Sequence, residues 1–70
     1  MKRYDILKRE GARIRKMRLS SGLSQRAVAE LLGVTQAAIS HIEHGKIDSL
    51  SLYIQIREVI SNENKRHTES

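Results

Sequence analysis

The sequence predicts an all-α domain, and two observations support that fold class. The 70-residue chain contains no proline, the residue that lacks a backbone N–H and breaks helices. Its apolar residues, 39% of the chain, are spaced mostly as in helices. Cysteine is absent, so the fold depends on packing or self-association rather than on disulfides or thiolate-bound metal. A chain of this length forms at most one small domain.

The first two helices are defined by their end signals. Asp5 is expected to act as the N-cap of a helix that ends at about Leu19. Ser24 caps a second helix, residues 25–32, and Gly33 ends it. The inward stripe of the first helix consists of Leu7, Ile14, Met17 and Arg18. The inward side of the second consists of Val28, Ala29, Leu31 and Leu32.

A third helix is expected over residues 36–44. Thr35 is its cap, and Gly45 supplies the left-handed residue that follows a helix. Ile39 and Ile42, three residues apart, would face inward. The connection between the second and third helices is therefore very short.

Residues 50–60 fit two patterns. Leu50, Leu52, Ile54 and Ile56 alternate with polar residues as a strand would. Helical stripes fit as well, one formed by Leu50, Tyr53, Ile54 and Ile60 and a second by Leu52, Ile56 and Val59. We favour a helix, because the segment continues into ordinary helix formers. No apolar residue occurs from position 61 onward, so residues 1–60 form the predicted domain and residues 61–70 a disordered, flexible tail.

Positive charge is concentrated at the N-terminal end. The formal net charge is +5, but residues 1–18 hold eight basic side chains against two acidic ones, whereas residues 19–70 come to −1. Such a segment binds polyanions, either nucleic acid through counterion release or an anionic membrane. No apolar run is long enough for a signal peptide or a membrane span, so we expect a cytoplasmic protein without membrane contacts. Nucleic acid is the first partner to consider.

The most informative segment is residues 25–44, where small and apolar residues fall at the crossing of two helices. Ala29 lets the third helix pass close over the second, and Gly33 permits a positive φ in the turn. Val34, together with the two inward isoleucines of the third helix, closes the joint. This pattern is typical of a helix-turn-helix.

Four motifs in register then carry a family resemblance. They are RIRKMR at 13–18, GLSQ at 22–25, LGVTQ at 32–36 and IEHGK at 42–46. Over about residues 10–60 the chain resembles the Cro and phage-repressor family, also called the Xre family. The resemblance implies a compact phage-repressor-like domain of four helices, or five. It also implies that the third helix enters the major groove of double-stranded DNA while the second lies across the backbone.

The same resemblance implies which side chains contact DNA. Base edges are assigned to the outer face of the third helix, namely Gln36, Ala37, Ser40 and His41. Gln36 is the leading candidate, because its amide matches the donor and acceptor pair of adenine, although a solvated glutamine is the alternative. Contacts with the DNA backbone are assigned to Gln25 and Thr35, and to the main-chain amides around Gly45 and Lys46 together with the Lys46 ammonium. The basic first helix adds charge from Arg13, Arg15 and Lys16.

Two further pairs of residues are interpreted structurally. Arg18 and Glu43 match family positions that form a partly buried ion pair, so we assign them to architecture. His41 and His44 have a spacing that can hold a metal, with His67 as a conceivable third ligand, but no carboxylate or cysteine matches it. We therefore expect neither a metal nor a cofactor, and no catalytic residues.

The chain departs from its family after the fourth helix, because the fifth helix that usually helps to form the dimer cannot be identified. We expect a homodimer through the stripe Leu52, Ile56 and Val59, or alternatively through paired strands. The predicted function is a sequence-specific transcriptional regulator, a repressor at a palindromic operator. The alternatives are the antitoxin of a toxin–antitoxin pair, with the toxin as protein partner, and a controller protein that also activates transcription.

Overall fold

The computed structural model describes residues 2–69, with side chains through residue 65, and this part of the chain is entirely helical apart from its connections. Its four helices are α1 (Arg3–Ser20), α2 (Gln25–Leu32), α3 (Gln36–Glu43) and α4 (Leu50–Glu69). The predicted all-α fold class is therefore confirmed. None of the helices described within residues 2–69 is long and apolar enough to cross a bilayer.

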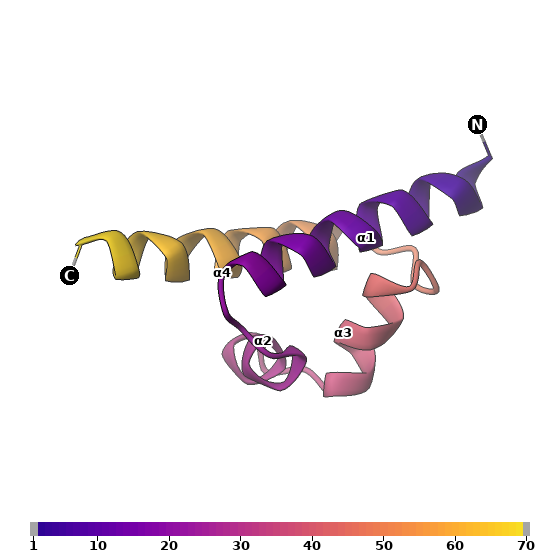
Figure 1. Cartoon of the computed structure of the whole chain (residues 1–70). Helices are drawn as coiled ribbons and strands as arrows, with labels where there is room; N and C mark the ends of the chain where they lie inside the picture. The colour runs from indigo at the N-terminus through magenta and orange to yellow at the C-terminus, as the bar shows by residue number, and fades with distance from the viewer. Residues whose placement is uncertain (1, 70) are drawn as a thin grey trace.

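The helices form two layers (Figure 1). The long helices α1 and α4 pack together and run in the same direction, while the short helices α2 and α3 lie on one side of them. α2 packs against α4, α3 packs against α1, and α2 and α3 contact each other. The core between the layers consists of Ile14, Val28, Ala29, Ile39, Ile42, Tyr53, Ile56 and Ile60. Every helix thus contributes to one core, which holds the two short helices in a fixed position.

Local sequence signals set the ends of the short helices. The Ser24 hydroxyl accepts a hydrogen bond from the Ala27 backbone N–H at 3.0 Å, and Thr35 does the same for Ala38 at 3.2 Å. Both predicted caps are therefore present. Gly33 ends α2 with a φ of 71°, the left-handed conformation that glycine adopts without steric cost.

The predicted start of the first helix was wrong by a few residues. α1 begins at Arg3, after Lys2, and the N-cap has no side-chain hydrogen bond. Asp5 lies inside the first turn instead of capping it. A carboxylate in this position still stabilises the helix, because it faces the positive end of the helix dipole.

The helical interpretation of the fourth segment is confirmed, but its extent and its buried face differ from the prediction. α4 continues through Glu69, where the sequence predicts a disordered tail from residue 61. No proline or glycine interrupts that segment, and extending an existing helix adds one hydrogen bond for each residue fixed. The last turns of α4 extend beyond the end of α1 (Figure 1).

Three apolar residues predicted to face inward are exposed. Leu50 and Ile54 are 74% and 44% exposed, and Leu31 on α2 is also exposed. Ile56, which the prediction places on a separate stripe, has no exposed surface. The spacing of apolar residues in this segment fits two helical phases, and only packing against α1 and α2 selects between them.

Two glycines let α1 approach the end of α3. A Cβ atom at Gly11 would overlap the Ile42 carbonyl oxygen and lie 2.7 Å from that of Glu43. A Cβ atom at Gly45, whose φ is 71°, would lie 2.7 Å from the Lys8 backbone nitrogen. Main chain therefore meets main chain at both positions, with no side chain between them.

Candidate nucleic-acid interface

One face of α3 is left open to solvent while the opposite face is locked into the core. Ile39 and Ile42 have no exposed surface, and they fix the rotation of the helix about its axis. The residues on the outer face are those predicted to meet bases. Gln36, Ala37 and His41 are exposed, and Ser40 is half-buried.

The crossing of α2 and α3 is as close as the sequence predicts. Ala29 is buried at the crossing, and its carbonyl oxygen accepts a hydrogen bond of 3.0 Å from the Val34 backbone N–H. Val34 is half-buried and packs against the core. A larger side chain at position 29 would separate the two helices, so this alanine helps to set the angle at which α3 leaves the body.

The structure brings Arg18 and Glu43 together as a bidentate ion pair. The Arg18 Nε and Nη2 atoms donate to the two carboxylate oxygens at 2.6 and 3.0 Å. The two side chains are only 8% and 0% exposed. Arg18 Nη1 also donates to the Leu23 carbonyl oxygen at 2.9 Å, so the pair connects α1, the following loop and the end of α3. Its place is architectural, behind the exposed face of α3.

A contact of Gln25 was not anticipated from the sequence. Its side-chain Nε2 donates to Glu43 Oε1 at 3.1 Å, which commits one amide N–H to the buried ion pair. The signal that could have revealed it is the carboxylate itself, because a buried carboxylate needs more donors than one arginine supplies. Gln25 remains at the amino end of α2, where a phosphate is favoured by the helix dipole.

The predicted use of the Gly45 and Lys46 backbone amides for a phosphate conflicts with the structure. The Gly45 N–H donates to the Ile42 carbonyl oxygen at 3.0 Å and the Lys46 N–H to that of His41 at 2.8 Å. These two bonds close the end of α3 as a Schellman motif. Gly45 is also buried, so of these two residues only the exposed Lys46 side chain is placed to reach a phosphate.

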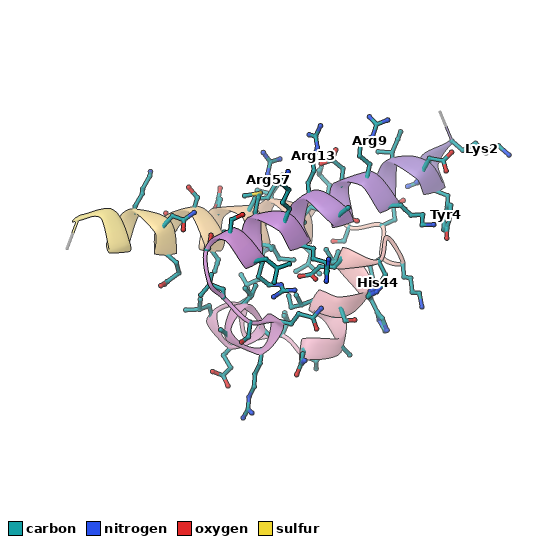
Figure 2. The ribbon with its side chains drawn as sticks, viewed as in Figure 1. Lys2, Tyr4, Arg9, Arg13, His44 and Arg57 are labelled. Atoms are coloured by element: carbon teal, nitrogen blue, oxygen red, sulfur yellow. The ribbon has the colours of Figure 1, made fainter. Side chains whose placement is uncertain are left out.

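Two of the three basic residues assigned to DNA on α1 lie on another face of the molecule. Arg13 and Lys16 line a hollow between α1 and α4 together with Arg57. Figure 2 shows Arg13 and Arg57 projecting from the long-helix layer, away from α2 and α3. Their assignment to an interface centred on α3 was therefore wrong. Arg15 is exposed and leaves α1 about 200° around the helix from Arg13.

The residues predicted to form a dimer interface are not equally accessible. Ile56 is part of the core of a single chain, so it cannot meet a second copy, and its assignment was wrong. Leu52 is half-buried and packs against the core, and Val59 is also half-buried. Both retain some surface on one edge of α4.

The histidines do not gather with other ligands in the part of the chain that the structure describes. His44 Nδ1 lies 2.7 Å from the Ser40 carbonyl oxygen of its own helix. No group of three or more histidine, aspartate or glutamate side chains is placed to hold a metal within the described residues. His67, the third ligand considered from the sequence, lies outside the side chains described.

Comparison with known proteins gives one family match. A model described as a helix-turn-helix domain matches residues 11–56, which is more than half of the chain. The matched range includes all of α2 and α3, together with α1 from Gly11 onward and the first turns of α4. No curated protein and no solved structure matches the chain.

Proposed function

Because this chain belongs to the helix-turn-helix domain family, we propose that it is a sequence-specific transcriptional regulator, a cytoplasmic repressor that occupies promoter DNA. The observation that carries the proposal is the division of α3 into two faces. Its inner face is fixed by fully buried isoleucines, while its outer face presents exposed side chains near the amino end. In helix-turn-helix proteins this end of the second helix of the motif meets base edges in the major groove.

The residues on the outer face of α3 supply a set of base contacts. Gln36 would pair with adenine through one donor and one acceptor. Ala37 would lie against a thymine methyl group, and His41, one turn later, would donate to guanine or to a phosphate. Ser40 can donate or accept with little selectivity, so it contributes fit more than discrimination.

Backbone contacts would come from both ends of the motif. Gln25 at the start of α2 retains acceptors and one further N–H, and the free backbone N–H groups of that helix end favour a phosphate. The exposed ammonium of Lys46 would hold a phosphate beyond the other end of α3. Thr35, just before α3, is exposed and could also contact the DNA backbone, although its hydroxyl oxygen already caps α3.

We further propose that the bound unit is a homodimer on a palindromic operator. A single α3 reaches few base pairs, whereas a symmetric pair reads two half-sites about 34 Å apart. The half-buried Leu52 and Val59 are the parts of the expected dimer stripe that still have surface to offer. Exclusion of Ile56 makes this apolar contact small, so we expect DNA to contribute to dimer assembly.

The test begins with selection of bound sequences from random duplex DNA. A two-fold symmetric consensus is expected, and binding to it should weaken steeply as salt is raised. Gln36→Ala should then lower the binding free energy by about 1–3 kcal/mol, and the variant should no longer discriminate between bases at one base pair of the site. Gln55→Ala is the matched control, because Gln55 is an exposed glutamine on α4. Failure to enrich any sequence, or equal effects of the two variants, would contradict the proposal.

A further inference from the structure

A groove follows the contact between α1 and α4, on the side of the long-helix layer from which Arg13 and Arg57 project (Figure 2). One hollow of about 460 Å³ is lined by residues of both helices. A second, of about 360 Å³, shares Met17 and Arg57 with it, so the two lie next to each other. We call this feature the α1–α4 groove and define it by Arg13, Lys16, Met17, Ile54 and Arg57.

The α1–α4 groove combines an apolar floor with a basic rim. Met17 is half-buried in it, and Ile54 keeps 44% of its surface exposed. Three cationic side chains stand at the larger hollow, namely Arg13, Lys16 and Arg57. The carboxylate that lines the same hollow is Glu10, which lies 3.7 Å from Arg13. The larger hollow therefore carries a net positive charge. In the smaller hollow Glu58 stands beside Arg57, so the excess of positive charge belongs to the larger one.

The apolar surface continues along the same contact. A third hollow, also of about 460 Å³, shares Glu10 with the first and is lined by Ile6 and Leu50. These two side chains are 45% and 74% exposed. Large exposed apolar side chains next to charged residues are typical of surfaces that bind another protein.

We propose that the α1–α4 groove binds an amphipathic helix with acidic side chains, supplied by a partner protein. Two packed helices that run in the same direction leave a channel in which a third helix can lie at the usual separation of 8–10 Å, roughly as in a bundle. Its apolar face would cover Met17 and Ile54, and its carboxylates would flank that face and meet Arg13, Lys16 and Arg57. The surface is separate from the outer face of α3, so the inference goes beyond DNA binding.

Charge and shape disfavour the other occupants. A second copy of this chain would bring the same cationic rim against itself, and like charges at an interface oppose association. A DNA backbone would satisfy the cations but would leave Ile54 and Leu50 against phosphates, with no apolar partner. A membrane surface is too flat to fill a channel between two helices.

The experiment titrates the full chain, labelled with ¹⁵N, with a synthetic helical peptide about four turns long. Leucines at positions i, i+3, i+4 and i+7 form its apolar face, and glutamates flank that face. One control peptide has lysine in place of glutamate, and another has the same composition in scrambled order. We expect saturable binding of the acidic peptide alone, with amide shifts concentrated in the groove-facing turns of α1 and α4.

Variants of the protein then test which residues bind the peptide. Arg13→Glu combined with Arg57→Glu should weaken binding of the acidic peptide by about tenfold or more, because attraction becomes repulsion at two positions. Ile54→Gln should weaken it through the apolar floor without a change of charge. Arg26→Glu matches the charge reversal on an exposed residue of α2 outside the groove and should have little effect. Circular dichroism on each variant verifies that it is folded.

Several results would overturn the inference. They are no saturable binding up to about 1 mM acidic peptide, equal binding of the lysine or scrambled peptide, and shifts outside the groove. Shifts of the groove residues by duplex DNA would assign the surface to nucleic acid instead. Self-association abolished by Ile54→Gln would assign it to a second copy. Gln36→Ala should retain peptide binding, so failure of the DNA proposal and failure of this one remain distinguishable.

Discussion

Arg18 and Glu43, 25 positions apart in the chain, form a bidentate ion pair with N–O distances of 2.6 and 3.0 Å in the interior of the domain. Each member has an additional partner, since Arg18 donates to the Leu23 carbonyl oxygen and Glu43 accepts from Gln25. One polar cluster thus connects α1, its following loop, the first residue of α2 and the last residue of α3. Because these groups are shielded from water, loss of one partner leaves the others with unsatisfied charge or hydrogen bonds.

Arg18→Ala should lower the free energy of unfolding by about 3–5 kcal/mol, because it leaves the Glu43 carboxylate buried without its cation. Urea denaturation followed by circular dichroism measures the change. Arg26→Ala is the control, since its ion pair with Glu30 is exposed and should be worth about 1 kcal/mol or less. The double variant Arg18→Met, Glu43→Leu should recover much of the loss. Equal small effects of Arg18→Ala and Arg26→Ala would show that the buried pair contributes little.

Gly11→Ala should destabilise the domain by about 1–3 kcal/mol or more, although alanine is the better helix former by about 1 kcal/mol. The reason is the contact with α3, where a Cβ atom would overlap the Ile42 carbonyl oxygen. Ala12→Gly, at the exposed neighbouring position, is the control and should lose only the difference in helix propensity. Thermal unfolding of the three proteins decides the matter, and a stabilised Gly11→Ala variant would rule out the close contact.

Ile56→Ala should cost about 2–5 kcal/mol of stability, because it leaves a cavity in the core of the single chain. Ile54→Ala, two residues earlier and partly exposed, should cost about 1 kcal/mol or less. Chemical denaturation together with sedimentation separates loss of folding from loss of association. A fully stable Ile56→Ala protein that only dissociates would place Ile56 between copies instead.

The stability of the domain should fall above pH 10, and Tyr53 should account for part of the fall. Burial raises the pKa of its hydroxyl above the ordinary value of 10.0, with smaller contributions from Glu10 and Asp48. Above pH 10 the unfolded chain therefore releases this proton more readily than the folded one, which favours unfolding. The hydroxyl also donates towards the Leu7 carbonyl oxygen at 3.3 Å.

Comparison with Tyr53→Phe isolates this effect from other groups that titrate at high pH. The wild type should have an unfolding free energy about 0.5–1.5 kcal/mol higher than Tyr53→Phe, because the variant lacks the hydrogen bond. This difference should be constant below pH 10 and decrease above it. Unfolding free energies of both proteins at pH 8 to 11 provide the measurement. A difference that stays constant across that range would show that the hydroxyl ionises alike in both states.

Local signals made much of the fold predictable from the sequence. Ser24 and Thr35 each stand directly before a segment with helical apolar spacing, and each caps the helix that follows. Gly33 ends α2 with a positive φ. These features depend on residues a few positions apart, so no tertiary information is needed to find them. The small residue at Ala29 also predicted the close crossing of α2 and α3, because such a crossing excludes larger side chains.

Features that depend on the packing of distant segments were harder to predict. Ile54 and Ile56 fit inward stripes equally well, and only the positions of α1 and α2 bury one and expose the other. Arg13 adds to the basic character of the N-terminal segment, but its direction follows from the side of α1 that α3 covers. The contact from Gln25 to Glu43 joins two residues 18 positions apart, and no local pattern marks it.

The contacts at Gly11 and Gly45, where the backbone of α1 meets the end of α3, have a mechanical consequence. Backbone groups in direct contact have no side-chain rotamers through which a strained fit could relax. The orientation of α3 relative to α1 is therefore rigid. A DNA duplex whose groove width or bend does not match this fixed orientation of α3 must itself deform to bind. Base pairs that the protein never touches would then influence affinity through the flexibility of the DNA.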